Sequence, residues 1–280
     1  MDKKQEGFLD LVIYQIYPRS FMDSNNDGIG DIRGIISKLD YICELGANAI
    51  WLCPCYKSPN KDNGYDVADY REIMDEFGTM DDMRELIREM HSRGMKLIMD
   101  LVVNHTSDEH EWFRKALAGD EKYKNYYFFR KGKGDGVPPN NWKSFFSGSA
   151  WNYYPELDEW ALHLFSSKQM DLNWDNPELR KEVYDMVSWW LQKGVDGFRM
   201  DVITLISKTP GLPDGDPTVA EIFGCGAEHY SWGPRLHEYL SELNENTFKK
   251  FPGSFCVAEP CSTGIEMVKL ISDASRGEVC

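Results

Sequence analysis

The chain has 280 residues, 42% hydrophobic and 28% charged, and this balance excludes a largely disordered protein. The net charge of −15 and the pI of about 4.9 argue against a nucleic-acid partner, because a phosphate backbone would be repelled. No signal peptide or membrane-spanning run is visible, so we expect no membrane partner. Seven cysteines without paired C-x-x-C motifs favour free thiols in a reducing cytoplasm.

Strand and helix patterns alternate along the chain. Apolar strands are expected at 12–16, 49–52, 96–102, a stretch ending at 201, and 254–257. Helices are expected at 31–45, 79–93, 177–193, 238–250 and 265–271. Five strand–helix units in series predict an α/β fold with a parallel sheet, either open and doubly wound or part of a (β/α)8 barrel.

Residues 104–173 interrupt this alternation with an aromatic, irregular stretch that is too long for a connecting loop. We therefore expect an inserted subdomain at 104–173. The flanking segments, 1–103 and 174–280, would form the two parts of the sheet-and-helix domain.

An arginine and an aspartate end the fourth predicted strand. Arg199 and Asp201 share one face of the strand by period-2 alternation. The guanidinium can keep the buried carboxylate anionic, which suits a nucleophile, although a plain structural ion pair explains the two residues equally well.

Polar residues also follow two neighbouring strands, where parallel α/β folds place their active sites. Asp100 and His105 end the third strand, and Glu259 ends the fifth. Two carboxylates on neighbouring strand ends match retaining glycoside hydrolysis, in which one attacks the sugar and the other transfers a proton. We expect Asp201 to stay ionised and Glu259, beside it, to have a raised pKa and to hold the proton.

Several sequence blocks resemble the α-amylase superfamily, glycoside hydrolase family 13. The first three family blocks are matched in order by DLVVNH (100–105), GFRMDV (197–202) and VAEP (257–260), and the fifth block by QMDLN (169–173). Three further stretches resemble the oligo-1,6-glucosidase (isomaltase) branch: QIYPRSF (15–21), SPNKDNGYDVADY (58–70) and NHTSDEHEWF (104–113). The resemblance runs from about residue 8 to 260.

This resemblance implies a (β/α)8 barrel with the insertion after the third strand. It implies Asp201 as the nucleophile and Glu259 as the acid/base of an enzyme that removes terminal non-reducing α-1,6-linked glucose from isomalto-oligosaccharides. The sugar-binding subsite would be lined by Asp62, Tyr65, Asp100, His105 and Arg199. Phe146 and Phe165 resemble aromatic wall residues of the pocket, but core packing explains them equally well.

Other substrates within the superfamily stay open. Val202 resembles the residue of α-1,6-specific members, whereas Thr204 stands where that branch often has asparagine. Trehalose-6-phosphate hydrolase, sucrose isomerase and α-1,4-glucosidase are alternatives of the same superfamily. A non-catalytic member of the fold is the alternative of another class, and the presence of Asp201, Arg199 and Glu259 argues against it.

An acidic loop after the first strand has the spacing of a calcium site. Oxygen ligands alternate along DSNNDGIGD (23–31) at Asp23, Asn25, Asp27, Ile29 (carbonyl) and Asp31. A glycine rather than glutamate at the twelfth position excludes an EF-hand, and the loop resembles the single structural calcium or magnesium loop of the glucosidase branch. An Asx-rich turn without metal is the alternative. No organic cofactor is expected.

The chain departs from the family pattern near its end. The fourth family block, three barrel strands and the C-terminal β-domain are not in this sequence, and Pro260 and Cys261 follow Glu259 where the branch has another pattern. We therefore expect either a fragment of a longer protein or a degenerate product, with an incomplete barrel and little or no hydrolytic activity as an isolated chain.

Overall fold

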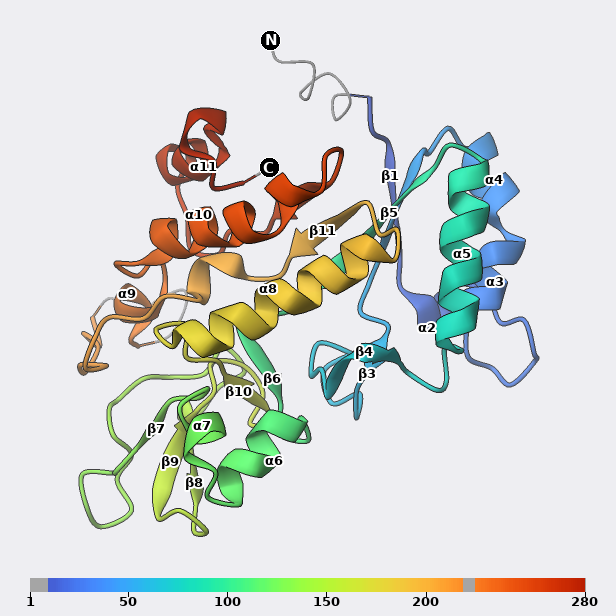
Figure 1. Cartoon of the computed structure of the whole chain (residues 1–280). Coiled ribbons are helices and arrows are strands. Elements are labelled where there is room, and N and C mark those ends of the chain that lie inside the picture. Colours follow the sequence, from blue (N-terminus) through green and yellow to red (C-terminus); the bar gives the residue numbers. More distant parts are fainter. Residues whose placement is uncertain (1–9, 219–224, 280) are drawn as a thin grey trace.

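The computed structural model describes residues 10–218 and 225–279. A parallel five-stranded sheet forms its centre (Figure 1). The strand order is β1 (Ile13–Ile16), β2 (Ala49–Leu52), β5 (Lys96–Leu101), β11 (Gly197–Met200) and β12 (Phe255–Ala258). The five strands expected from the sequence are confirmed, and they pair in the order of the chain.

Helices follow each strand, as the alternation predicts. They are α2 (Pro18–Phe21), α3 (Ile32–Ser37), α4 (Leu39–Glu44), α5 (Met80–Ser92), α8 (Pro177–Gln192), α9 (Ala227–Tyr230), α10 (Leu236–Asn246) and α11 (Ile265–Ser272). Figure 1 shows α3, α4 and α5 together beside the β1 end of the sheet, and α8 and α10 toward the other end. Short 3-10 turns lie at η1 (Ile203–Leu205), η2 (Phe248–Lys250) and η3 (Ala274–Arg276).

Two expected helices are shorter than the pattern predicts. The helix expected at 31–45 is divided into α3 and α4, because Lys38 leaves the helical region at φ −112° and ψ 6°. The helix expected at 238–250 ends at Asn246, and Thr247 turns the chain into η2 with φ −126° and ψ −88°. In both cases the apolar spacing continues across a break in the backbone hydrogen bonds.

The segment between β5 and α8 forms a separate unit below the sheet in Figure 1. It is more regular than we expect from its sequence, because its aromatic residues pair across short strands. Strands β6 (His105–Ser107) and β10 (Gln169–Asp171) are antiparallel, and β7 (Phe129–Arg130), β9 (Glu159–Leu162) and β8 (Trp151–Tyr154) form a second sheet. Helices α6 (Glu111–Leu117) and α7 (Glu121–Lys124) complete it. A further hairpin, β3 (Tyr56–Lys57) with β4 (Asp69–Ile73), follows β2.

The core is divided between two main clusters. The larger one fills the space between the sheet and its helices, and includes the buried rings of Trp174 and Trp190. The second joins the inserted segment to the chain after β11 through Trp142, Leu205 and Tyr230. This second cluster holds the inserted segment against the carboxyl end of β11. Within residues 10–218 and 225–279, no helix has the length and apolar character to cross a membrane.

Candidate active site

Four charged side chains meet at the carboxyl ends of three neighbouring strands. The register places Arg199 of β11 opposite Asp100 of β5. The Arg199 Nη1 atom lies 2.6 Å from Asp100 Oδ1 and 2.5 Å from Asp201 Oδ1, and Nη2 lies 2.5 Å from Glu259 Oε2. One guanidinium therefore binds three carboxylates, and the two candidate catalytic groups lie on its two terminal nitrogens.

The backbone after β11 turns sharply at the candidate nucleophile. Val202 adopts φ +40° and ψ 36°, a left-handed conformation that is costly for a β-branched residue. In this conformation the Val202 amide donates to Glu259 Oε2 at 3.0 Å, while the Asp201 amide donates to the Leu101 carbonyl at 3.0 Å. The strained turn thus holds Asp201 at the strand end and ties it to Glu259.

Burial dominates the electrostatics of this cluster. Asp201 is buried and its pKa rises to about 8, because desolvation and the neighbouring Asp100 and Glu259 carboxylates outweigh the attraction of Arg199. Burial likewise raises the pKa of Asp100 to about 6. The predicted Arg199–Asp201 ion pair is present, but burial opposes the anionic form of Asp201 and three carboxylates share the one guanidinium.

The two carboxylates also differ in exposure. The Glu259 side chain is 42% exposed and that of Asp201 is 8% exposed. Glu259 follows β12, the edge strand of the described sheet, whereas Asp201 follows β11, which is covered by a neighbour on each side.

Two aromatic side chains enclose the Arg199–Asp100 pair. The Trp51 indole donates to Asp100 Oδ2 at 2.8 Å, and the guanidinium carbon of Arg199 lies 5.0 Å from the Trp51 ring centre. The Tyr65 hydroxyl donates to the same Asp100 oxygen at 3.4 Å. Trp51 was not among the expected site residues, although its position near the carboxyl end of a predicted strand was a usable signal.

A second polar group contains the expected sugar-binding residues Asp62 and His105. The Gln169 amide nitrogen donates to Asp62 Oδ2 at 2.9 Å and lies 3.1 Å from His105 Nε2. His105 Nε2 is also 3.2 Å from the Tyr65 carbonyl, so Tyr65 contacts both polar groups. Burial lowers the pKa of His105 and favours the neutral ring. Gln169 is a further site residue that we did not single out from the sequence.

The candidate wall residues Phe165 and Phe146 lie at increasing distance from His105. The Phe165 ring centre lies 5.2 Å from that of His105, and Phe165 stacks on Phe145 at 4.9 Å and 11°. Phe146 is 54% exposed and meets the edge of Phe165 at 5.8 Å. Phe165 thus contacts the subsite directly, whereas Phe146 lies one ring further out.

A buried ion pair underlies the subsite. Lys208 Nζ lies 2.7 Å from Asp171 Oδ2 and donates to Asn104 Oδ1 at 3.0 Å, with 1% and 0% of the lysine and aspartate side chains exposed. Burial lowers the pKa of Lys208, and Asp171 opposes that shift. The pair connects the chain after β11 to β10, and the single lysine in an apolar stretch was the signal for it.

The acidic loop after β1 closes on itself. Asp23 accepts hydrogen bonds from the backbone amides of residues 25, 26 and 28, and these hydrogen bonds lower its pKa. The Asp31 carboxylate caps α3 through Gly34 and also binds Ser24. Within the described ranges no group of three or more His, Cys, Asp or Glu side chains is placed to hold a metal ion. The oxygen donors of the acidic loop suit a hard cation, and the calcium site stays a prediction.

Comparison with known proteins identifies the family. The "Alpha amylase, catalytic domain" model matches residues 15–279. An oligo-1,6-glucosidase of Parageobacillus thermoglucosidasius is 57% identical over 271 residues, which are 96% of this chain and 48% of that protein. One of Bacillus cereus is 55% identical, covering 99% and 49%.

Solved structures with the same fold also match this chain. A mutant of a Bacillus licheniformis trehalose-6-phosphate hydrolase has a TM-score of 0.92 at 48% identity, and a trehalulose synthase has 0.92 at 49%; each match covers 96% of this chain and 48% of the other. The chain spans about half the length of the curated relatives it matches. The five strand–helix units are accordingly those of the N-terminal half of a (β/α)8 barrel, and the chain belongs to the α-amylase catalytic-domain family.

Proposed function

We propose that this chain carries the nucleophile and the acid/base of a retaining α-glucosidase that removes terminal α-1,6-linked glucose from isomalto-oligosaccharides. The observation that carries the proposal is the contact of Arg199 with both Asp201 and Glu259 at the carboxyl ends of β11 and β12. Both carboxyl groups bind one guanidinium, and this arrangement is compatible with the separation of about 5 Å that double displacement needs.

The proposed reaction has two steps. Glu259 donates a proton to the glycosidic oxygen while Asp201 attacks the anomeric carbon, so the sugar–oxygen bond breaks and a glucosyl ester forms on Asp201. Glu259 then takes a proton from water, the water oxygen attacks the same carbon, and glucose leaves with its configuration retained.

This sequence requires the single proton of the pair to lie on Glu259 when the substrate is bound. Asp201 and Glu259 bind the same guanidinium, so a change of charge on one carboxylate acts directly on the other. Of the two side chains, Glu259 is the more exposed in the described chain, and we assign the proton donor to it. A sugar that accepts a hydrogen bond from Glu259 would draw the proton onto it and leave Asp201 anionic.

The polar group around His105 would hold the terminal sugar. Asp62 can accept hydrogen bonds from sugar hydroxyls, and Tyr65 and Phe165 offer ring faces to the apolar side of the pyranose. Gln169 fixes Asp62 beside His105, so we assign it a positioning role.

The α-1,6 preference is supported by the relatives and by Val202. Five similar curated proteins named oligo-1,6-glucosidase are 50–57% identical to this chain. An α-glucosidase of Pediococcus pentosaceus at 54% and the trehalose-6-phosphate hydrolase and trehalulose synthase structures keep the other substrates as alternatives. A single side chain such as Val202 contributes only about 1–3 kcal/mol to discrimination, so the substrate requires measurement.

We also propose a structural calcium or magnesium ion in the loop of residues 23–31, with Asp23, Asn25, Asp27, Asp31 and the Ile29 carbonyl as its ligands. We also propose a reducing compartment such as the cytoplasm, on the cysteine spacing of the sequence, which has no paired C-x-x-C motifs.

Mass spectrometry of a full-length protein, of the length of its relatives, after incubation with a mechanism-based glucosyl fluoride tests the proposal. We expect one glucosyl adduct on the peptide that contains Asp201, and none in the Asp201→Asn variant. Initial rates on isomaltotriose, maltotriose, sucrose and trehalose 6-phosphate then rank the substrates. An adduct on another residue, or none on protein that circular dichroism shows to be folded, would count against the enzyme and favour a non-catalytic binding protein.

A further inference from the structure

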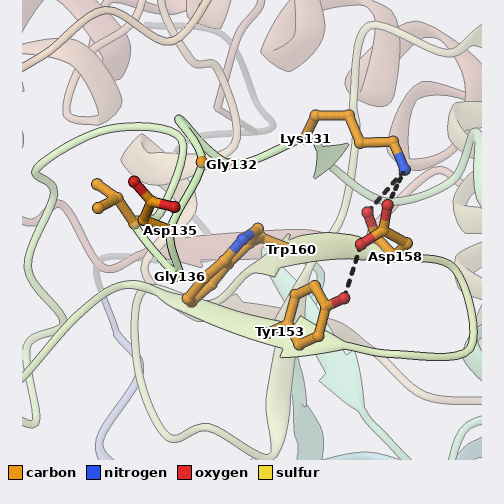
Figure 2. Close-up of a pocket in the computed structure, with 9 residues that line it drawn as sticks. Lys131, Gly132, Asp135, Gly136, Tyr153, Asp158 and Trp160 are labelled. Carbon is orange, nitrogen blue, oxygen red and sulfur yellow. Dashed lines mark hydrogen bonds and ion pairs between the residues drawn. The ribbon is translucent and has the colours of Figure 1, made fainter.

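A separate pocket lies on the inserted segment, away from the carboxylate cluster. It has a volume of about 510 Å³, within the range of about 300–1,000 Å³ that is usual for ligand sites. Lys131, Tyr153, Asp158, Trp160 and the 132–137 loop line it, and none of these residues belongs to the site described above. Figure 2 shows the two aromatic rings between Asp135 of the loop and the Lys131–Asp158 pair.

Two aromatic rings form the floor of this pocket. Tyr153 of β8 and Trp160 of β9 are direct cross-strand partners, with ring centres 5.5 Å apart. On the same face, Trp151 and Leu162 are buried in the second core cluster. Tyr153 and Trp160 continue that face beyond the core, and Tyr153 is 47% exposed. The pair therefore presents aromatic surface to the pocket.

Polar groups on one side fix this aromatic surface. The Tyr153 hydroxyl donates to Asp158 Oδ1 at 2.7 Å, and Lys131 Nζ donates to the Asp158 carbonyl at 2.7 Å and to Oδ2 at 3.0 Å (Figure 2). These contacts restrict the tyrosine ring before any ligand arrives. They also leave the polar atoms of Lys131 and Asp158 beside an aromatic face, which is the usual composition of a site for a ligand with one apolar and one polar side.

The glycine-rich loop forms the opposite wall. A Cβ atom at Gly132 would lie 2.6 Å from Trp160 Nε1 and 2.4 Å from the Val137 carbonyl, so only glycine allows the loop to approach the indole this closely. Gly134 and Gly136 have positive φ angles of +94° and +74° and open space at their Cβ positions. The loop is thus tightly packed at its base, and its tip carries the exposed Asp135 carboxylate.

We propose that this pocket binds a neutral, α-linked gluco-oligosaccharide at a second site, outside the catalytic centre. A pyranose ring has an apolar face that can stack on Tyr153 and Trp160 and hydroxyls that can bind Lys131, Asp158 and Asp135. The net charge of −15 and the two carboxylates disfavour an anionic ligand. The choice of α-linked glucose rests on the proposed function, because the pocket and the catalytic site would then bind the same kind of oligosaccharide.

Titration of the protein with isomaltotetraose, in the presence of saturating 1-deoxynojirimycin, tests this second site. The iminosugar occupies the catalytic subsite, so the remaining binding reports the pocket. In 15N-labelled protein, we expect the Trp160 indole signal, assigned with Trp160→Phe, to shift on titration. We expect Tyr153→Ala to weaken the affinity at least fivefold, because it removes the stacking face. The matched control is Tyr41→Ala, which removes a tyrosine on α4 that is 50% exposed, and it should change nothing.

The two proposals fail independently in this experiment. An unmoved Trp160 signal in the wild type, or equal affinities for wild type and Tyr153→Ala, would overturn the second site while iminosugar binding still supports the catalytic one. If iminosugar binding is lost while the Trp160 signal still shifts, the catalytic site is overturned and the second site is supported. If Tyr153→Ala does not fold, the Trp160 signal of the wild-type protein decides by itself.

Discussion

Replacing Asp201 by asparagine measures directly whether burial or Arg199 controls this carboxyl group. The two effects predict opposite stability changes. The pKa of Asp201 rises from 3.8 to about 8 on folding, because burial and two neighbouring carboxylates outweigh the guanidinium. Between these pH values the unfolded chain has lost a proton that the folded chain still holds, so the wild type loses stability as the pH increases. Asparagine has no proton to lose and avoids this cost.

As the pH rises, the unfolding free energy of Asp201→Asn should therefore increase relative to that of the wild type. The slope approaches about 1.4 kcal/mol per pH unit between about pH 4 and 8, for a total on the order of 5 kcal/mol, and it levels off above pH 8.

Urea denaturation followed by circular dichroism from pH 4.5 to 9 provides the measurement. The control is Asp75→Asn, which changes an exposed carboxylate on the turn after β4 and should show no such increase. If Arg199 were dominant, the folded-state pKa would lie below 3.8, and the wild type would be the more stable protein throughout this pH range. A constant difference, or one that favours the wild type as the pH rises, would refute the reasoning.

Three further predictions follow from the same contacts. Glu259→Gln removes a charge that raises the pKa of Asp201, so labelling by a glucosyl fluoride, which needs no acid, should reach its half-maximal rate at a lower pH than in the wild type; an unchanged midpoint would contradict this. Lys208→Met leaves Asp171 buried without its partner and should cost about 3–5 kcal/mol in urea denaturation, whereas a loss below about 1 kcal/mol would make the pair a weak one. Millimolar calcium should raise the melting temperature of the wild type but not of Asp23→Ala, and equal shifts would exclude the proposed ion.

The five strands and the positions of the charged residues could be predicted because they depend on local periodicity. Alternation along β11 places Arg199 and Asp201 on one face, and parallel pairing brings Asp100 to the same edge. The division between α3 and α4 could not be predicted, because the apolar spacing continues through Lys38 while the backbone does not.

The ionisation of the carboxylates around Arg199 could not be predicted from the sequence, for a different reason. Spacing shows that an arginine can reach an aspartate, but it does not show how many other carboxylates share that arginine. Asp100 is 99 residues distant from Arg199 along the chain and Glu259 is 60 residues distant, and both bind the same guanidinium. Gln169 and Trp51 were missed in the same way, since each acts through a contact made between distant segments.

Under the proposed mechanism, the shared guanidinium of Arg199 links the nucleophile Asp201 to the acid/base Glu259. The cost of burying Asp201 makes its anionic form unfavourable in the resting site, and this raises its basicity toward a proton or an electrophilic carbon alike. Glu259 accepts a hydrogen bond from the amide of Val202, the residue whose strained turn also fixes Asp201. A bound sugar that moves the proton to Glu259 therefore generates the anion only where the anomeric carbon can accept it.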